Sequence, residues 1–220
     1  MTYVVTSDTV LTEFTAPNLP LAPYTYDSKY HEQQNNVLRL YFNQIDNIVR
    51  QLTASTDTSG LRVPYGAFQD STDQTAVSTT VAYPVTFNTT DFSNGVTVVS
   101  NSRITVTNAG IYNLQFSIQL TNTTNASQDV DIWFRVNGTN VANSNSRFGL
   151  APRKSPGDPF HIIAALNYFV SLNATDYVEI VWRTTDTGVS IEQYAVSVSP
   201  TRPAVPSAIA TLSFVSALSA

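Results

Sequence analysis

The chain has 220 residues, of which 42% are apolar and 12% are charged, and its formal net charge is −5. This length supplies one well-filled core and an appendage. With a net charge of −5, the chain has no excess of basic residues to attract phosphate groups, so we expect no nucleic-acid partner.

The chain contains no cysteine, which excludes disulfides, thiolate chemistry and cysteine-bound zinc. No run approaches the ~20 apolar residues that span a bilayer, so we expect no membrane insertion. The N-terminus lacks the basic and apolar regions of a signal peptide. The sequence therefore predicts a protein that is made and folded in a cytosol.

Residues 1–27 predict an extended arm. Pro17, Pro20 and Pro23 disfavour helix and favour a polyproline-like strip. A frayed terminus is the alternative, but the segment is too apolar for an idle tail, and we expect it to order against another protein. The predicted anchoring residues are Val4, Val10, Leu11, Phe14, Leu19 and Leu21.

Residues 28–53 predict one helix that begins near Asp27 or Ser28. Its apolar residues recur at 3-4-3-4 spacing, which places them on one seam. The seam residues are Leu38, Tyr41, Ile45, Ile48 and Leu52. The seam covers fewer than three heptads, and a coiled coil of that length is not stable alone. We therefore interpret the seam as a trimeric coiled coil beside a trimeric β-domain. Packing on the chain's own β-domain is the alternative.

After a linker at residues 54–67, residues 68–220 predict an all-β domain, because the hydrophobic period becomes two. Strands are expected at residues 96–99, 103–107, 112–120, 130–136, 168–172, 177–182 and 208–214. Asn137-Gly138 is a strong two-residue hairpin signal. Many antiparallel strands without a second long helix indicate a sandwich or jelly roll. Its expected core aromatics are Tyr112, Phe116, Trp133 and Trp182.

The longest non-periodic stretch of this domain runs from residue 142 to 159. Long loops on rigid scaffolds often carry binding function, so it is a candidate ligand loop, and a trimer contact is the alternative. Its candidate residues are Asn143, Asn145, Arg147, Phe148, Arg153 and Lys154.

Few residues suggest catalysis. His31 and His161 belong to different segments and to no metal-ligand spacing. Glu179 and Glu192 lie in β-stretches, where exposed acids are routine. We therefore expect no enzymatic activity and no cofactor.

Calcium is the one cation that the acids suggest. Asp129 with Asp131, or Asp186 with neighbouring carbonyls, could supply oxygen ligands. No D-x-D-x-D-G loop is present, so we expect no metal site.

Two motifs resemble the jelly-roll domains of the C1q/TNF-like family. Residues 103–116 are similar to its "F-x-V-x-x-x-G-x-Y-x-F" core, and residues 172–180 to its "L-x-x-G-D-x-V" strand entry. In the second motif Thr175 replaces the usual glycine, which puts the backbone geometry of that turn in question.

A second resemblance is to jelly-roll domains in structural proteins of tailed bacteriophages. It rests on residues 65–72, 83–88, 132–138 and 206–212, with residues 37–47 similar to a helix ahead of such domains. The resemblance implies a homotrimeric C1q/TNF-like jelly roll on a virion, used as a tail fibre, spike or capsid decoration (cement) protein, with no catalytic residues.

In that interpretation the protein is assembled in the host bacterial cytoplasm. Its partners would be two further copies of itself, a major capsid or tail/portal protein that holds the arm, and a host-surface glycan if the domain adsorbs to cells. The alternative is a secreted or cell-surface carbohydrate-binding adhesion module.

Overall fold

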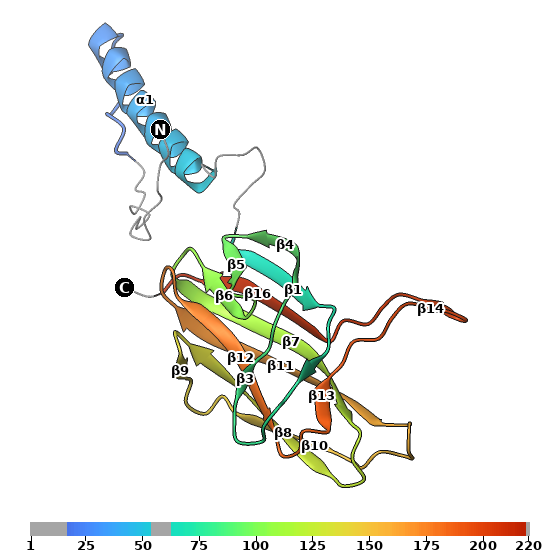
Figure 1. Cartoon of the computed structure of the whole chain (residues 1–220). Coiled ribbons are helices and arrows are strands. Elements are labelled where there is room, and N and C mark those ends of the chain that lie inside the picture. Colours follow the sequence, from blue (N-terminus) through green and yellow to red (C-terminus); the bar gives the residue numbers. More distant parts are fainter. Residues whose placement is uncertain (1–16, 54–62, 219–220) are drawn as a thin grey trace. The chain divides into compact units, whose positions relative to one another are not determined.

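The computed structural model describes residues 17–53 and 63–218. The chain divides into two compact units, Met1–Arg62 and Val63–Ala220, which we describe separately (Figure 1).

The first unit contains a single described helix, α1 (Ser28–Thr53), which confirms the predicted helix and its boundaries. Asp27 caps its start, because the Lys29 N–H donates to Asp27 Oδ1 at 2.9 Å. Residues 17–27 form neither helix nor strand. The Tyr30 hydroxyl donates to the Pro20 carbonyl at 3.3 Å, which joins this segment to the first turn of α1.

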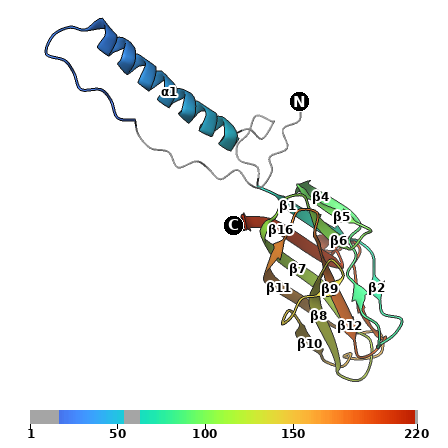
Figure 2. The ribbon, with the colours of Figure 1, turned by 90° about the vertical axis from the view of Figure 1, so that its left-hand side faces the viewer.

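The second unit consists mainly of antiparallel β-strands in two sheets, as the period of two predicts (Figures 1 and 2). Sheet I contains β1 (Tyr65–Asp70), β2 (Gln74–Thr75), β4 (Thr89–Asn94), β7 (Gly110–Asn122), β11 (Phe160–Leu172), β13 (Val189–Ile191) and β16 (Ala208–Ser216). Sheet II contains β3 (Tyr83–Pro84), β5 (Val96–Val99), β6 (Arg103–Val106), β8 (Gln128–Val136), β9 (Thr139–Asn140), β10 (Ser146–Leu150) and β12 (Tyr177–Thr184). A small hairpin of β14 (Ser197–Val198) and β15 (Thr201–Arg202) extends from the sheets (Figure 1).

Long strands organise both sheets. In sheet I, β7 pairs with β11 over thirteen residue positions on one edge, and with β16 and β13 on the other. β16 in turn lies between β7 and β1. In sheet II, β12 lies between β8 and β6, and β8 also pairs with β10 and β9. The outward side chains of three adjacent strands therefore form rows across each sheet.

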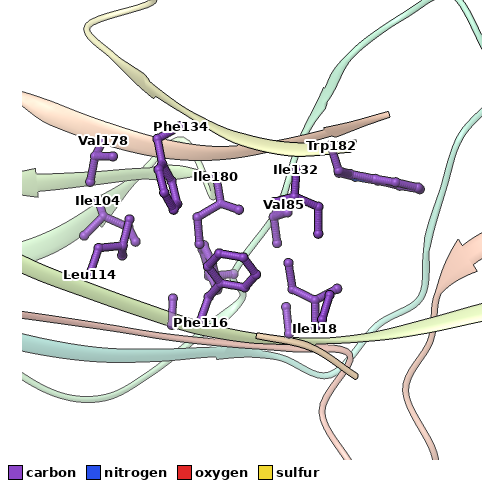
Figure 3. Close-up of a cluster of buried hydrophobic side chains, with 14 of the residues drawn as sticks. Val85, Ile104, Leu114, Phe116, Ile118, Ile132, Phe134, Val178, Ile180 and Trp182 are labelled. Carbon is purple, nitrogen blue, oxygen red and sulfur yellow. The ribbon is translucent and has the colours of Figure 1, made fainter. Parts of the chain in front are cut away.

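One hydrophobic core lies between the sheets (Figure 3). The predicted core residues Tyr112, Phe116 and Trp182 are all buried in it. The Tyr112 hydroxyl donates to the Asn108 carbonyl at 2.7 Å, and burial raises its pKa to about 12. This hydrogen bond satisfies the one polar group of a buried tyrosine.

The prediction that Trp133 belongs to the core is wrong. Trp133 is only partly buried, whereas Ile132 and Phe134 on either side of it face the core. Successive strand residues point to opposite faces, so Trp133 shares the outward face of β8 with Asp131 and Arg135.

Two predicted boundaries also differ from the structure. The β-unit begins at Val63 and its first strand at Tyr65, so the predicted linker at 54–67 ends too late. The predicted loop at 142–159 contains a strand, β10, which pairs with β8. The pairing gives Arg147 and Phe148 fixed positions on a sheet.

The predicted Asn137-Gly138 hairpin is confirmed. Both residues have positive φ, 48° and 81°, and they connect β8 to β9. Thr175 also has a positive φ of 71°, so the turn keeps the conformation that suits glycine although a β-branched residue occupies it. Asp176 stabilises this turn by accepting a hydrogen bond from the Asn173 N–H at 2.7 Å.

Among the described residues, no helix is both long enough and apolar enough to cross a membrane.

Candidate functional site

The two sheets differ in the charge of their outer faces. Strands β7, β11 and β16 of sheet I contain no Asp, Glu, Lys or Arg. Strands β8, β10 and β12 of sheet II carry Asp129, Asp131, Arg135, Arg147, Glu179 and Arg183. Charged side chains are typically depleted from the centre of a protein interface, so the sheet I face is the candidate assembly face.

The assembly face, defined as the outward residues of β7, β11 and β16, presents apolar side chains among uncharged polar ones. Ile163 is 56% exposed and Phe169 58%, and both point outward from β11. Ile209 and Val215 of β16 are also exposed. These apolar side chains are exposed and do not belong to the core of the β-unit.

Asn113 of β7 has an unsatisfied polar atom beside this face. Its side-chain oxygen is buried without a hydrogen-bond partner in the described part of the chain. It lies on β7 between Phe169 of β11 and Ser213 of β16. A buried amide oxygen without a partner costs about 1–3 kcal/mol.

The helix α1 carries the other candidate assembly surface. Leu38, Tyr41 and Ile45 are partly buried, whereas Leu40 and Phe42 are exposed. Apolar residues therefore occupy more of the helix surface than the predicted seam alone. Ile48 and Leu52 lie within α1, but their side chains are outside the described residues.

The predicted anchor can be located only in part. Leu19 and Leu21 are exposed, Leu21 at 94%. Val4, Val10, Leu11 and Phe14 lie outside the described residues.

The outer face of sheet II contains a buried carboxylate between two arginines. Arg147 donates to Asp131 through Nε at 2.8 Å and Nη2 at 3.3 Å, and Arg183 donates through Nε at 3.0 Å. The hydrogen bond from Arg147 lowers the pKa of Asp131; burial opposes this effect and Arg183 reinforces it. Three strands, β10, β8 and β12, are cross-linked by this cluster, and Asp129 on the same face of β8 also attracts Arg147.

A hollow of about 330 Å³ opens beside this cluster. Its lining residues come from β8, β9, β12 and the segment after β9, and they are Asp131, Trp133, Asn140, Val141, Asn143, Asn145 and Arg183. We call it the Trp133 pocket. Its volume is at the lower end of the range for small-molecule sites, about 300–1,000 Å³.

The tryptophan that lines the pocket is held in place by the hairpin. Trp133 Nε1 donates to Asn140 Oδ1 at 2.8 Å, and Arg135 Nε donates to the same oxygen at 3.4 Å. The indole therefore has a fixed orientation while part of its surface is open to solvent.

The segment that carries Asn143 and Asn145 is also fixed. Ser144 between them is buried, and its hydroxyl donates to the Val141 carbonyl at 2.8 Å and accepts from the Phe134 N–H at 3.1 Å. Asn143 itself has a positive φ of 60°. The anchor at Ser144 places the two amides beside the pocket on a rigid support.

The structure places the residues of the predicted ligand loop in different surroundings. Asn143 and Asn145 line the pocket, and Arg147 binds one of its lining residues. Phe148 packs against the core instead. Arg153 and Lys154 do not line the pocket: Arg153 donates to the Thr123 carbonyl at 3.2 Å and Lys154 pairs with Asp158 at 3.8 Å.

Four residues of the pocket were not predicted as parts of one site: Asp131, Trp133, Asn140 and Arg183. Asp131 and Trp133 share one face of β8 with Arg135, and the alternation of side chains along a strand is enough to predict this. The approach of Arg183 depends on the pairing of β12 with β8, which the sequence does not reveal.

The expectation that Glu179 is exposed is wrong. Glu179 is buried, accepts the Ser102 hydroxyl at 2.9 Å and lies 3.8 Å from Arg103. His161 lies in a network at the end of β11, where its Nδ1 is 2.8 Å from the Tyr194 hydroxyl and 3.1 Å from that of Thr121. These contacts are hydrogen bonds between side chains, and they do not mark His161 as a residue that reacts with a substrate.

Two of the three carboxylates proposed for calcium have other partners. Asp131 has both oxygens bound by arginines, and Asp186 Oδ1 accepts the Gly188 N–H at 2.8 Å within its own turn. Within residues 17–53 and 63–218, no group of three or more His, Cys, Asp or Glu side chains is placed to hold a metal.

No family model matches the chain, and no curated protein matches it either. The basis for a function is therefore the sequence motifs, the assembly face, the surface of α1 and the Trp133 pocket.

Proposed function

We propose that the chain is a homotrimeric structural protein of a bacteriophage virion, with a jelly roll of the C1q/TNF type, an assembly helix and an anchoring arm. The observation that carries the proposal is the contrast between the uncharged assembly face of sheet I and the charged outer face of sheet II. One face is suited to burial between identical subunits, and the other to display in water.

The helix supports the same assembly. Its seam residues Leu38, Tyr41 and Ile45 lie on the stripe expected of a coiled coil. In a trimer, contacts between the helices and contacts between the β-units strengthen each other, because each chain links one set of contacts to the other. The threefold number comes from the resemblance to C1q/TNF-like domains.

Two roles on the particle fit this organisation. A cement protein lies across capsid subunits and stabilises the head, whereas a fibre or spike threads a tail or portal protein and contacts the host. In both roles residues 1–27 attach to the particle and the β-unit is displayed.

Assembly is tested by light scattering on the purified 24.0 kDa chain. Ile45→Asp on the helix seam and Phe169→Asp on the assembly face should each weaken a trimer. Asn43→Asp, on the exposed polar side of α1, and Thr97→Asp, on the outer face of sheet II, are the matched controls and should not. A stable wild-type monomer at micromolar concentration would contradict the trimer.

The location is tested on purified particles. Mass spectrometry should detect the chain in them, and electron cryo-microscopy should show its position on the head or tail. Deleting residues 1–22 should release intact trimers, because the apolar anchor residues are removed. Full occupancy after this deletion would mean that attachment runs through the helix or the β-unit.

The Trp133 pocket favours a second candidate, a carbohydrate-binding adhesion module. Its aromatic and amide lining is suited to sugars, and a displayed domain can combine both functions.

A further inference from the structure

We infer that the Trp133 pocket binds an acidic sugar, a pyranose ring that bears a carboxylate. This inference goes beyond the proposed structural role and does not depend on the trimer, since every residue it uses belongs to sheet II or to the segment between β9 and β10 of one chain.

The first argument is the platform. Trp133 presents a partly exposed indole whose orientation is set by the bond from its Nε1 to Asn140. The C–H face of a pyranose is apolar and flat, so it packs on an aromatic ring. A ring that is already fixed loses little conformational entropy when the sugar arrives.

The second argument is the supply of amides. Asn140 uses only its oxygen, and the side chains of Asn143 and Asn145 make no hydrogen bond among the described residues. Each free amide offers donors, and those of Asn143 and Asn145 also offer acceptors. Neighbouring sugar hydroxyls require both, so the lining matches them without rearrangement.

The third argument is charge. Asp131 is shared by two arginines, of which Arg147 also interacts with Asp129, and among the described residues Arg183 uses Nε alone for its contact with Asp131. Arg183 lines the pocket, its side chain is 43% exposed, and its remaining N–H groups can donate to a carboxylate in parallel. This local positive charge occurs in a chain whose net charge is −5, and it selects an acidic sugar over a neutral one.

The test uses the pocket's own tryptophan. The chain has two tryptophans, so Trp182→Phe leaves Trp133 as the one that reports by fluorescence. Glucuronic acid and N-acetylneuraminic acid should change its emission saturably, and glucose should bind about tenfold more weakly. Saturation-transfer NMR with the wild-type chain provides a second measurement that needs no variant.

Variants separate the pocket from the rest of the surface. Asn145→Ala should weaken binding of all three sugars by about tenfold. Arg183→Gln should remove the preference for the acids over glucose, while Arg147 still binds Asp131. Asn125→Ala, an exposed asparagine in the loop between β7 and β8, lies outside both the pocket and the assembly face; it is the control and should change nothing. Circular dichroism checks that each variant is folded.

The inference is overturned if none of the three sugars binds the wild-type chain at about 10 mM. It is equally overturned if Asn145→Ala has no effect, or if glucose binds as well as the acids. Light scattering on the same samples keeps the two proposals apart: a monomer that binds acidic sugars refutes the trimer and supports the pocket, and a trimer that binds none does the reverse.

Discussion

Substitution of the two tryptophans should lower the free energy of unfolding by very different amounts, because one is buried and the other lines a pocket at the surface. Trp182 is 1% exposed, and its indole N–H has no partner in the described part of the chain. Trp182→Ala should lower the free energy of unfolding by about 3–5 kcal/mol through the cavity it leaves. Trp182→Phe should cost within about 1 kcal/mol, because lost packing of about 1–2 kcal/mol is offset by removing a buried N–H that costs about 1–3 kcal/mol.

Trp133 provides the matched pair. Trp133→Phe removes one hydrogen bond to Asn140 at a partly exposed site, so it should cost about 1 kcal/mol or less, and Trp133→Ala should cost far less than Trp182→Ala. Urea denaturation followed by circular dichroism measures all four variants.

Fluorescence gives an independent check. Trp133→Phe leaves only the buried tryptophan, whose emission should lie at shorter wavelength and resist quenching. Trp182→Phe leaves only the exposed one, which should emit at longer wavelength. Equal costs for the two alanine variants, or the reverse order of emission, would refute the assignment of the two faces of β8 and β12.

Three further predictions follow from the turns, the carboxylates and the unit boundary. Thr175→Gly should leave the free energy of unfolding unchanged or raise it by up to about 1 kcal/mol, whereas Ala174→Gly beside it should lower it by about 0.5–1 kcal/mol; urea denaturation showing the reverse order would contradict strain at φ 71°. Burial raises the pKa of Asp176, but hydrogen bonds from Asn137 and Asn173 outweigh it and the net pKa is lowered, as it is for Asp131. The stability that these acids contribute should therefore be present above an unfolded-state pKa of about 3.9 and be lost as pH falls through the lower folded values. NMR titration should show Asn137→Ala moving the pKa of Asp176 upward, and no movement would contradict the role of that bond. Residues 63–220 should fold without the helix, with a β-type circular dichroism spectrum and a cooperative melt; a random-coil spectrum would contradict the unit boundary.

The sequence was sufficient to predict the elements with a strong period. The 3-4-3-4 spacing marks α1, and alternation marks β7, β8 and β12. Periodicity does not reveal β4, where almost every side chain is exposed and no alternation exists. It also does not reveal β10, which is short and surrounded by asparagine and proline.

The candidate site was less predictable, because it depends on register. In the run of β8 both Trp133 and Phe134 are large and aromatic, and only the outward charges of Asp131 and Arg135 distinguish the faces. Asp131 meets Arg147 and Arg183 at sequence separations of 16 and 52 residues. Those contacts require the pairing of three strands, and a one-residue shift would send each side chain to the other face.

The position of β16 has a consequence for biosynthesis. β16 is the last strand along the chain, yet it lies inside sheet I, where it separates β7 from β1. Until it leaves the ribosome, β1 and β7 each present an unpaired edge, and the sheet cannot close around its core. Pairing between the two ends of the β-unit is highly non-local, which slows folding. The sandwich can therefore be completed only after β16 has been synthesised.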